Sequence, residues 1–291
     1  MKLTILAVPY SAGRPGEGTG LGPTCYLKAR PELMLAEAGH DVEVLTLHPE
    51  LGATATEPEA VARIDAALAA AVSDALASGR FPLILAGNCN SCLGTLAGLQ
   101  DRDGSAAPTT GVVWFDAHGD LNTPESSPDG FFDGMGLAIA TGRAYPEIRE
   151  RAGLRAAIPE SWVLHLGSRD LDAPERGYLE SSTMAWTTAA DLQQGGMAAP
   201  LGEALRALRA QVAVVYMHID IDVLSGAFAP GVDFPSLGGL ALDELEDAVR
   251  MVAREFTVRC AALTAYDPDH EREKTTLRSG LRLMQVIAEA V

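Results

Sequence analysis

Short apolar runs alternate along this chain with longer segments in which apolar residues recur every three or four positions. The apolar runs predict strands at residues 3–8, 41–47, 83–86, 110–115, 162–166, 212–217 and 259–264. The helical periodicity predicts helices at residues 61–79, 201–210, 242–256 and 278–289, and a single helix that starts at Pro23 and ends before Gly39. Strands that alternate with helices pair in parallel and are covered by the crossover helices. We therefore expect an α/β fold of three layers, with a parallel central sheet and helices on both of its faces.

The size and composition of the chain limit the classes of protein to consider. Its 291 residues suffice for one large α/β domain, and because no linker or repeat divides them we expect a single domain over residues 1–291. The 39 acidic against 22 basic residues give a net charge of −17, which argues against nucleic acid or an anionic membrane as a partner. The first apolar run is too short for a signal peptide or a membrane span, which predicts a cytoplasmic protein.

Two of the predicted strands lead into triplets of ionisable residues. The triplets are Asp116, His118 and Asp120 in WFDAHGDLN, and His218, Asp220 and Asp222 in MHIDIDVL. In open α/β sheets, ligands bind beyond the carboxyl ends of the strands. Because side chains two positions apart in an extended segment point to the same face, each triplet should aim its three groups in one direction.

The aspartates of the two triplets repel one another unless a positive charge lies between them. A buried ion that is not neutralised costs several kcal/mol at order of magnitude, and a divalent metal removes that cost directly. Aspartates with a histidine suit Mn²⁺ better than they suit a structural zinc site, and so many ligands are typical of two metals that share carboxylates. A single D-x-H-x-D could be a polar loop, whereas two triplets at two strand ends predict a metal centre.

A cysteine lies at a third strand end, in FPLILAGNCNSCLG. Considered alone, Cys89 is compatible with a packed core thiol, because unpaired cysteine is often buried. Cys89 and Cys92 form C-x-x-C, which leaves a redox dithiol open but excludes a four-thiolate zinc site, since no second pair follows.

These segments resemble the motifs of a known family. DAHGDLNTP and HIDIDVLSGAFAPGVDFPSLGG resemble the two metal signatures of the arginase/agmatinase (ureohydrolase) family, and GLGP at 20–23 and AYDP at 265–268 fall where that family has short motifs. The resemblance implies an arginase-like fold, two Mn²⁺ per chain, and hydrolysis of a guanidino or amidino carbon in a small molecule. It also implies a homo-oligomer, a trimer or a hexamer.

The same motifs imply a role for each residue of the metal centre. By position, Asp116 and Asp220 bridge the two metals, Asp120 completes one site, and the other site is completed by His118 and Asp222. In this family a hydroxide held by both metals attacks the substrate carbon, and the amine leaves once it is protonated. Asp120 is the candidate to hold the hydroxide and to move that proton.

Four positions depart from the family pattern. Cys89 stands at the family's remaining ligand, the His of G-G-D-H-S, so the resemblance favours a thiolate ligand over a core thiol. Ala265 replaces a Glu that grips the guanidinium, with loss of a charge-assisted bond worth roughly 1.5–3 kcal/mol. Asp133 stands where arginases carry a proton-shuttling His. It either relays a proton or binds a polar N–OH group, or it is an exposed loop residue. His218 replaces a Ser that is not a ligand, and is expected to face the site behind the ligands or against the substrate.

The other end of the predicted substrate is amino-acid-like. LGSRDLDAPE at 166–175 resembles the arginase stretch that binds the α-amino group, with Asp172 as its Asp and Glu175 as the supporting Glu. Asn122 and Ser127 fall where the arginase loop contacts the α-carboxylate. Asp129 in the same loop would repel a carboxylate if it pointed inward.

These departures together resemble the subgroup that hydrolyses Nω-hydroxy-L-arginine to L-ornithine and hydroxyurea in D-cycloserine biosynthesis. Its guanidino group is less basic than that of arginine and needs the missing Glu less. Alternative substrates for the same centre are arginine, agmatine, another guanidino acid or formiminoglutamate, and a thiolate ligand could admit Zn²⁺ or Fe²⁺. A third alternative is a non-catalytic homologue in which Cys89, Asp133 and Ala265 mark a decayed site.

Overall fold

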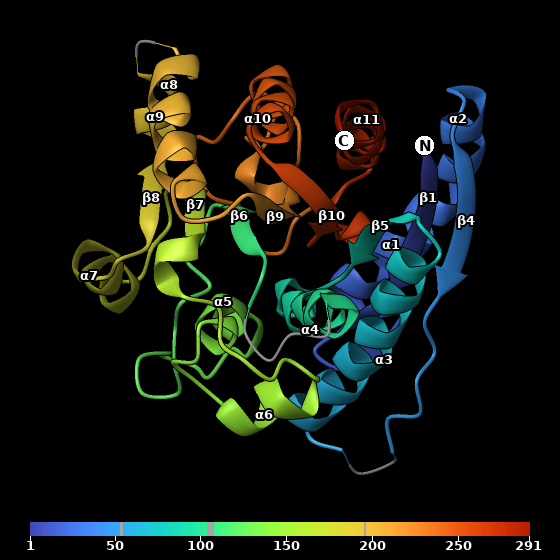
Figure 1. The fold of residues 1–291 in the computed structure, drawn as a ribbon, viewed down its shortest axis with the longest axis horizontal. Helices are drawn as coiled ribbons and strands as arrows, with labels where there is room; N and C mark the ends of the chain where they lie inside the picture. Colours follow the sequence, from blue (N-terminus) through green and yellow to red (C-terminus); the bar gives the residue numbers. More distant parts are fainter. Residues whose placement is uncertain (53–54, 104–107, 195) are drawn as a thin grey trace.

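A parallel sheet forms the centre of the protein (Figure 1). The computed structural model describes residues 1–52, 55–103, 108–194 and 196–291. Eight of the described strands form one sheet in which every neighbouring pair is parallel. In spatial order the strands are β4 (Asp41–Thr46), β1 (Lys2–Val8), β5 (Phe81–Ala86), β10 (Thr257–Thr264), β9 (Val214–Asp220), β6 (Gly111–Phe115), β7 (Val163–Ser168) and β8 (Ala185–Thr188).

Helices cover both faces of this sheet, which confirms the predicted three-layer architecture (Figure 1). The helices on one face are α1 (Leu21–Lys28), α2 (Pro31–Glu37), α8 (Ala189–Gln193), α9 (Ala198–Arg209), α10 (Leu242–Glu255) and α11 (Thr275–Ala290). The helices on the other face are α3 (Glu57–Ala77), α4 (Cys92–Asp103), α5 (Gly136–Ala140), α6 (Pro146–Arg151) and α7 (Ala173–Ser181). Each face packs its own apolar core against the sheet.

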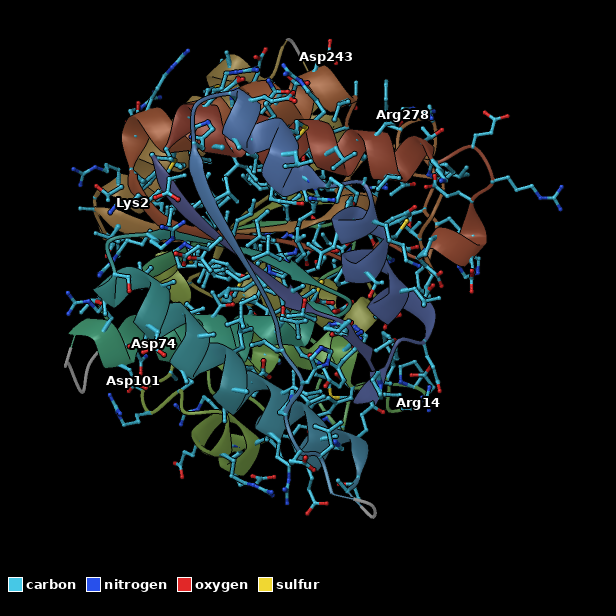
Figure 2. All side chains as sticks on the ribbon, turned by 90° about the vertical axis from the view of Figure 1, so that its right-hand side faces the viewer. Lys2, Arg14, Asp74, Asp101, Asp243 and Arg278 are labelled. Carbon is cyan, nitrogen blue, oxygen red and sulfur yellow. The ribbon has the colours of Figure 1, made fainter. Side chains whose placement is uncertain are left out.

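Two strands near the middle of the sheet, β5 and β6, are apolar along their whole length, which is typical of strands covered on both faces. Strands β5 and β6 are buried at every position, as expected for parallel strands between two helical layers. Figure 2 shows side chains filling the space between the layers, while charged residues such as Asp74, Asp243 and Arg278 point outward. None of the described helices has the length and apolar composition required to cross a membrane.

The prediction of one helix from Pro23 to Gly39 is wrong. Helix α1 ends at Lys28 and α2 begins at Pro31, and Arg30 between them adopts a left-handed conformation with φ of 58°. Proline has no N–H and disfavours the helical conformation in the residue before it, so the chain breaks at this point. Strand β8 was not predicted, because its half-buried sequence AWTT contains no apolar run.

The carboxyl ends of the strands meet at one edge of the sheet, where loops and short 3₁₀ helices extend the chain. The hairpin of β2 (Tyr10–Ser11) and β3 (Arg14–Pro15) crosses the end of β5. A Cβ atom at Gly87 would lie 2.2 Å from the carbonyl oxygen of Tyr10, so only glycine allows this approach. The hairpin thereby closes one side of the region in which the ionisable triplets lie.

Candidate metal centre

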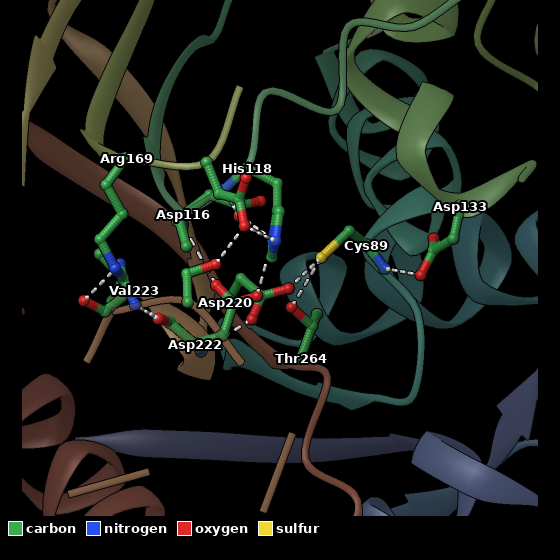
Figure 3. Close-up of polar contacts among 12 residues, drawn as sticks. Cys89, Asp116, His118, Asp133, Arg169, Asp220, Asp222, Val223 and Thr264 are labelled. Carbon is green, nitrogen blue, oxygen red and sulfur yellow. Dashed lines mark hydrogen bonds and ion pairs between the residues drawn. The ribbon is translucent and has the colours of Figure 1, made fainter. Parts of the chain in front are cut away.

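The structure brings the six predicted metal ligands together at the carboxyl ends of β5, β6 and β9. Figure 3 labels five of them, all except Asp120. One ligand atom each of Cys89, Asp116 and Asp120 lie within 4.8 Å of one another, and so do ligand atoms of Asp116, His118 and Asp222. Asp116 belongs to both groups. The arrangement offers two adjoining cation sites with one shared carboxylate.

The first triplet reaches the site on irregular backbone rather than on a strand. Strand β6 ends at Phe115, and the backbone N–H of His118 donates to Asp116 Oδ1 at 2.7 Å. Asp120 has φ of 52°, a left-handed conformation that is uncommon for a residue other than glycine. The prediction that this triplet is extended is therefore wrong, although all three side chains still converge on the site.

Part of the second triplet does lie on a strand. Asp220 is the last residue of β9, and Asp222 lies on the 3₁₀ helix η5 (Ile221–Val223) that follows, with its N–H donating to Asp220 Oδ1 at 2.8 Å. The backbone N–H of Ala117 donates to Asp222 Oδ1 at 3.1 Å and so ties the two triplets together. His218, two residues before Asp220, lies fully buried within the sheet and does not line the cavity.

The carboxylates lack sufficient positive charge around them. Burial together with Asp222 raises the pKa of Asp116 to about 6, and burial raises the pKa of Asp220 well above its usual range. Burial opposes the charge of His118, but hydrogen bonds with Asp116 and Asp222 outweigh it and raise the pKa of His118 to about 12. His118 Nδ1 lies 2.9 Å from Asp222 Oδ2.

This donor set fits divalent cations. Asp120 Oδ2 is buried and has no hydrogen-bond partner among the described residues, and burial with neighbouring carboxylates raises the pKa of Asp120 well above its usual range. A buried oxygen without a donor is costly, and oxygen-rich clusters of this kind are typical ligands of hard cations. The chemistry of the residues therefore agrees with the predicted metal centre.

Cys89 contacts this carboxylate cluster. It lies on the 3₁₀ helix η2 (Cys89–Ser91), its Sγ donates to Asp220 Oδ2 at 2.9 Å, and it also contacts Thr264 Oγ1 at 3.1 Å (Figure 3). Burial, and then the charge of Asp220, raise the pKa of the Cys89 thiol. Cys92 has a different environment, because its Sγ points to the carbonyl oxygen of Gly136 at 3.6 Å. The two sulfurs form no disulfide.

The cluster lies in a cavity of about 530 Å³. None of the described residues that line it is Lys or Arg. The acidic lining residues are Glu57, Asp120, Asp129, Asp133, Asp170, Asp172, Glu175, Asp220, Asp222 and Asp233. Phe131 and Phe234 line it as well, with ring centroids 5.1 Å apart, and both are partly exposed. Such a cavity suits a small cationic molecule.

The residues predicted to bind the amino-acid end line the same cavity. Asn122 Nδ2 donates to Asp172 Oδ2 at 2.8 Å, and Glu175 accepts from the N–H groups of Leu121 and Asp172, both at 3.0 Å. A Cβ at Gly119 would lie 2.6 Å from Glu175 Oε1, so the glycine makes room for this carboxylate. These contacts hold Asp172 at the start of α7.

The loop that carries Ser127 adopts a self-contained turn. Ser127 Oγ donates to Asp129 Oδ1 at 3.3 Å and accepts from the N–H of Gly130 at 3.0 Å. Asp129 Oδ1 also accepts from the N–H of Phe131 at 3.0 Å. The carboxylate of Asp129 is therefore turned onto its own loop, which reduces the repulsion considered from the sequence.

Asp133 is not an exposed loop residue. Its half-buried carboxylate accepts hydrogen bonds from Asn88 Nδ2 at 2.6 Å, from the N–H of Cys89 at 3.3 Å and from the N–H of Asn90 at 2.9 Å. Burial raises the pKa of Asp133 to about 6 despite these donors. Asp133 thus holds the turn that carries Cys89.

Sequence reasoning missed two residues that position ligands. The guanidinium of Arg169 donates to three carbonyl oxygens of the turn after β9, those of Asp222, Val223 and Leu224, at 2.6, 3.3 and 3.2 Å (Figure 3). Trp114 Nε1 donates to Asp116 Oδ2 at 2.9 Å. Trp114 lies two positions before Asp116, which was a usable signal, whereas nothing local to Arg169 indicates its contacts.

Comparisons with known proteins agree with this geometry. A family model described as the arginase family matches residues 1–288. An arginase from Bacillus caldovelox is 30% identical over 97% of this chain and 96% of its own length, and one from Brevibacillus brevis is 30% identical over 98% and 97%. A crystal structure of arginase from Bacillus subtilis superposes with a TM-score of 0.88 at 28% identity, covering 99% of this chain and 98% of that one. The formimidoylglutamase of Bacillus subtilis, at 19% identity and a TM-score of 0.77 over 99% and 86% of the two chains, is similar in fold.

Proposed function

This chain belongs to the arginase family, and we propose that it is a binuclear-metal hydrolase that cleaves Nω-hydroxy-L-arginine with water into L-ornithine and hydroxyurea. The observation behind the proposal is the convergence of six potential ligands, five of which line a cavity together with Ala265 and with no Lys or Arg among the described residues. We further propose that residues 1–291 act as one catalytic domain, in the cytoplasm, and that the chain forms a trimer or hexamer.

The proposed cofactor is two Mn²⁺ ions per chain. The residues that would hold them are Cys89, Asp116, His118, Asp120, Asp220 and Asp222. When bound, the ions would neutralise the carboxylates and make water a nucleophile at neutral pH. A thiolate at Cys89 is a softer ligand, so Zn²⁺ and Fe²⁺ are the alternatives to be tested by metal analysis.

Asp120 is the proposed proton carrier. Its Oδ2 has no hydrogen-bond partner among the described residues, and it lines the cavity. It is therefore free to accept a proton from the attacking water and to return it to the departing amine of ornithine. Asp133 also lines the cavity, and we propose that it contacts the hydroxylated nitrogen while it holds the Cys89 turn.

The missing Glu sets the substrate preference. Ala265 has φ of 64° and lines the cavity at the place where arginase-like enzymes carry that Glu. A fully charged guanidinium would there lack a charge-assisted hydrogen bond worth roughly 1.5–3 kcal/mol. A hydroxylated guanidine is less basic and carries less positive charge, so it loses less binding free energy when the Glu carboxylate is missing.

At the other end of the substrate, Asp172 is the proposed partner of the α-ammonium group. Its hydrogen bonds with Asn122 and Glu175 hold it in place. Asn122 and Ser127 are the proposed contacts of the α-carboxylate. A second candidate substrate is agmatine, because no Lys or Arg among the described lining residues would pair with a carboxylate.

The test is kcat/KM for Nω-hydroxy-L-arginine, L-arginine and agmatine on Mn²⁺-loaded enzyme and on its Cys89→His variant. We expect the hydroxylated substrate to be preferred, and the preference to fall in Cys89→His. Preference for arginine or agmatine would refute the proposed substrate but would still agree with a binuclear-metal hydrolase. No turnover, with less than one metal per chain, would instead support a non-catalytic homologue.

A further inference from the structure

Four buried residues form a continuous path of polar contacts beneath the metal centre. Tyr216 OH lies 2.7 Å from His218 Nδ1, and His218 Nε2 lies 3.4 Å from Thr264 Oγ1. Thr264 Oγ1 in turn lies 3.1 Å from Cys89 Sγ (Figure 3). None of the four is more than 3% exposed, so water does not compete for these contacts.

If Cys89 is a thiolate, each hydrogen bond on this path can have only one donor and one acceptor. A thiolate has no proton and can only accept, so Thr264 must give its single hydroxyl proton to Cys89 Sγ. The Thr264 oxygen then accepts from the N–H at His218 Nε2. A neutral imidazole has one N–H, which leaves Nδ1 to accept from the hydroxyl of Tyr216.

The surroundings hold this path in place. The ring of His218 stacks on Trp114 with centroids 3.6 Å apart and an angle of 7° between the planes. Trp114 is itself fixed by its hydrogen bond to Asp116. The Thr264 hydroxyl has one competing acceptor, the carbonyl oxygen of Ile219, but at 3.4 Å it is farther away than Cys89 Sγ.

Two residues on the path stand at positions where the sequence departs from its family. Cys89 stands at a family His and His218 at a family Ser, and Thr264 connects them in space. We propose that Thr264 and His218 are positioning residues that deliver a hydrogen bond to the Cys89 thiolate, which orients the sulfur and weakens its donation of electrons to a bound metal. This inference rests on the proposed role of Cys89 as a metal ligand.

The test uses the full chain loaded with Co²⁺, whose bond to a thiolate gives a sulfur-to-metal charge-transfer band in the near ultraviolet. The wild-type enzyme should show this band, and Cys89→His should lack it. Thr264→Val keeps the side-chain shape but removes the hydroxyl, so the band should move to lower energy. Because the sulfur is then no longer oriented, metal affinity should fall about 10- to 100-fold. Thr264→Ser should restore both, and His218→Phe, which keeps the stack on Trp114, should give a smaller shift in the same direction.

Thr110→Val is the matched control, because the hydroxyl of Thr110 is buried and has no hydrogen-bond partner among the described residues. It should leave the band and the affinity unchanged. An unchanged band in both Thr264→Val and His218→Phe would refute the inference. A Co²⁺-loaded wild type without the band would refute it too, by removing Cys89 from the ligands. In that case, turnover of Nω-hydroxy-L-arginine by the same sample would still support the proposed function, and no turnover would refute it as well.

Discussion

The cavity layer and the sheet layer below it both contain histidine but place it in opposite electrostatic surroundings. We define the cavity layer as Cys89, Asp116, His118, Asp120, Asp220 and Asp222. We define the sheet layer as Trp114, His165, Tyr216, His218 and Thr264. In the cavity layer, two carboxylates raise the pKa of His118 to about 12 despite burial. In the sheet layer, burial lowers the pKa of His165 to about 4 and that of His218 well below its usual range.

The two layers are only two residues apart along the strands. Trp114 pairs with both His165 and His218 across the sheet, and its neighbour two positions on, Asp116, already belongs to the cavity layer. Histidines of the same chain therefore differ in charge because of their surroundings: neighbouring carboxylates favour the charged form, and apolar burial favours the neutral form. Within one pleat past the strand end, a neutral packed histidine gives way to a histidine held between two carboxylates.

The largest effect is expected in the cavity layer. Asp220→Asn removes the negative charge of a carboxylate that accepts hydrogen bonds from Cys89 Sγ and from the N–H of Asp222. Because this carboxylate is a proposed metal ligand, we expect kcat to fall at least about 1,000-fold. Metal content measured by elemental analysis should fall together with turnover. The exposed Asp74→Asn on α3 is the control. An Asp220→Asn protein that keeps two metals per chain would contradict the ligand assignment.

The next effect concerns stability in the sheet layer. Neither ring nitrogen of His165 makes a hydrogen bond of ordinary geometry among the described residues. Its folded pKa of about 4 lies below the unfolded value, so between those values the unfolded state binds the extra proton. The contribution of His165 to the free energy of unfolding should therefore fall by about 3 kcal/mol as the pH drops from 6.5 to 4.

Denaturant unfolding of the metal-free protein over this pH range measures that slope. His165→Leu should remove this contribution, and since the other titrating groups are common to both proteins, the difference between variant and wild type isolates it. Parallel curves for the two proteins would show that His165 accepts a proton when folded.

A direct comparison of two histidines separates the layers. His118→Asn should lose metal and about 100-fold in kcat/KM, because His118 belongs to one of the two ligand groups. His218→Asn should keep two metals per chain and lose at most about 10-fold, because His218 acts only through Thr264. Equal losses of metal in both variants would break the distinction between the layers.

The smallest effect sharpens the account of specificity. Ala265→Glu supplies the carboxylate that a charged guanidinium needs, and it should raise kcat/KM for L-arginine about 10-fold relative to Nω-hydroxy-L-arginine. Ala265→Ser, which adds a polar atom without charge, is the matched control. A ratio unchanged by the Glu would mean that hydroxyarginine selectivity comes from elsewhere in the cavity.

Most of the fold was predictable because it depends on local patterns. The apolar runs and helical periods of the sequence predicted the parallel sheet and its two helical layers. The break between α1 and α2 was also predictable, since Pro31 disfavours a helical residue before it. Strand β8 was not, because its half-buried residues pack at an edge and carry no periodic signal.

The candidate site was predictable as a set of residues but not as a geometry. Strand alternation placed Asp220 correctly, yet it failed for the triplet at Asp116, where the backbone leaves the strand. It also could not reveal that His218 points into the sheet toward Thr264, because that contact joins β9 to β10. Arg169 was missed for the same reason, since its three acceptors lie more than fifty residues away in sequence.

Asp116 belongs to both ligand groups, and this has a consequence for how the centre assembles. Two cations that share one carboxylate do not bind independently. The first cation to bind neutralises part of the charge of Asp116 and fixes its orientation, and the second cation binds to this altered carboxylate. Loading and depletion of the two proposed ions should then be coupled, and the half-filled centre should have an affinity of its own. In a chelator titration of this protein, the two metals should leave in two distinguishable steps.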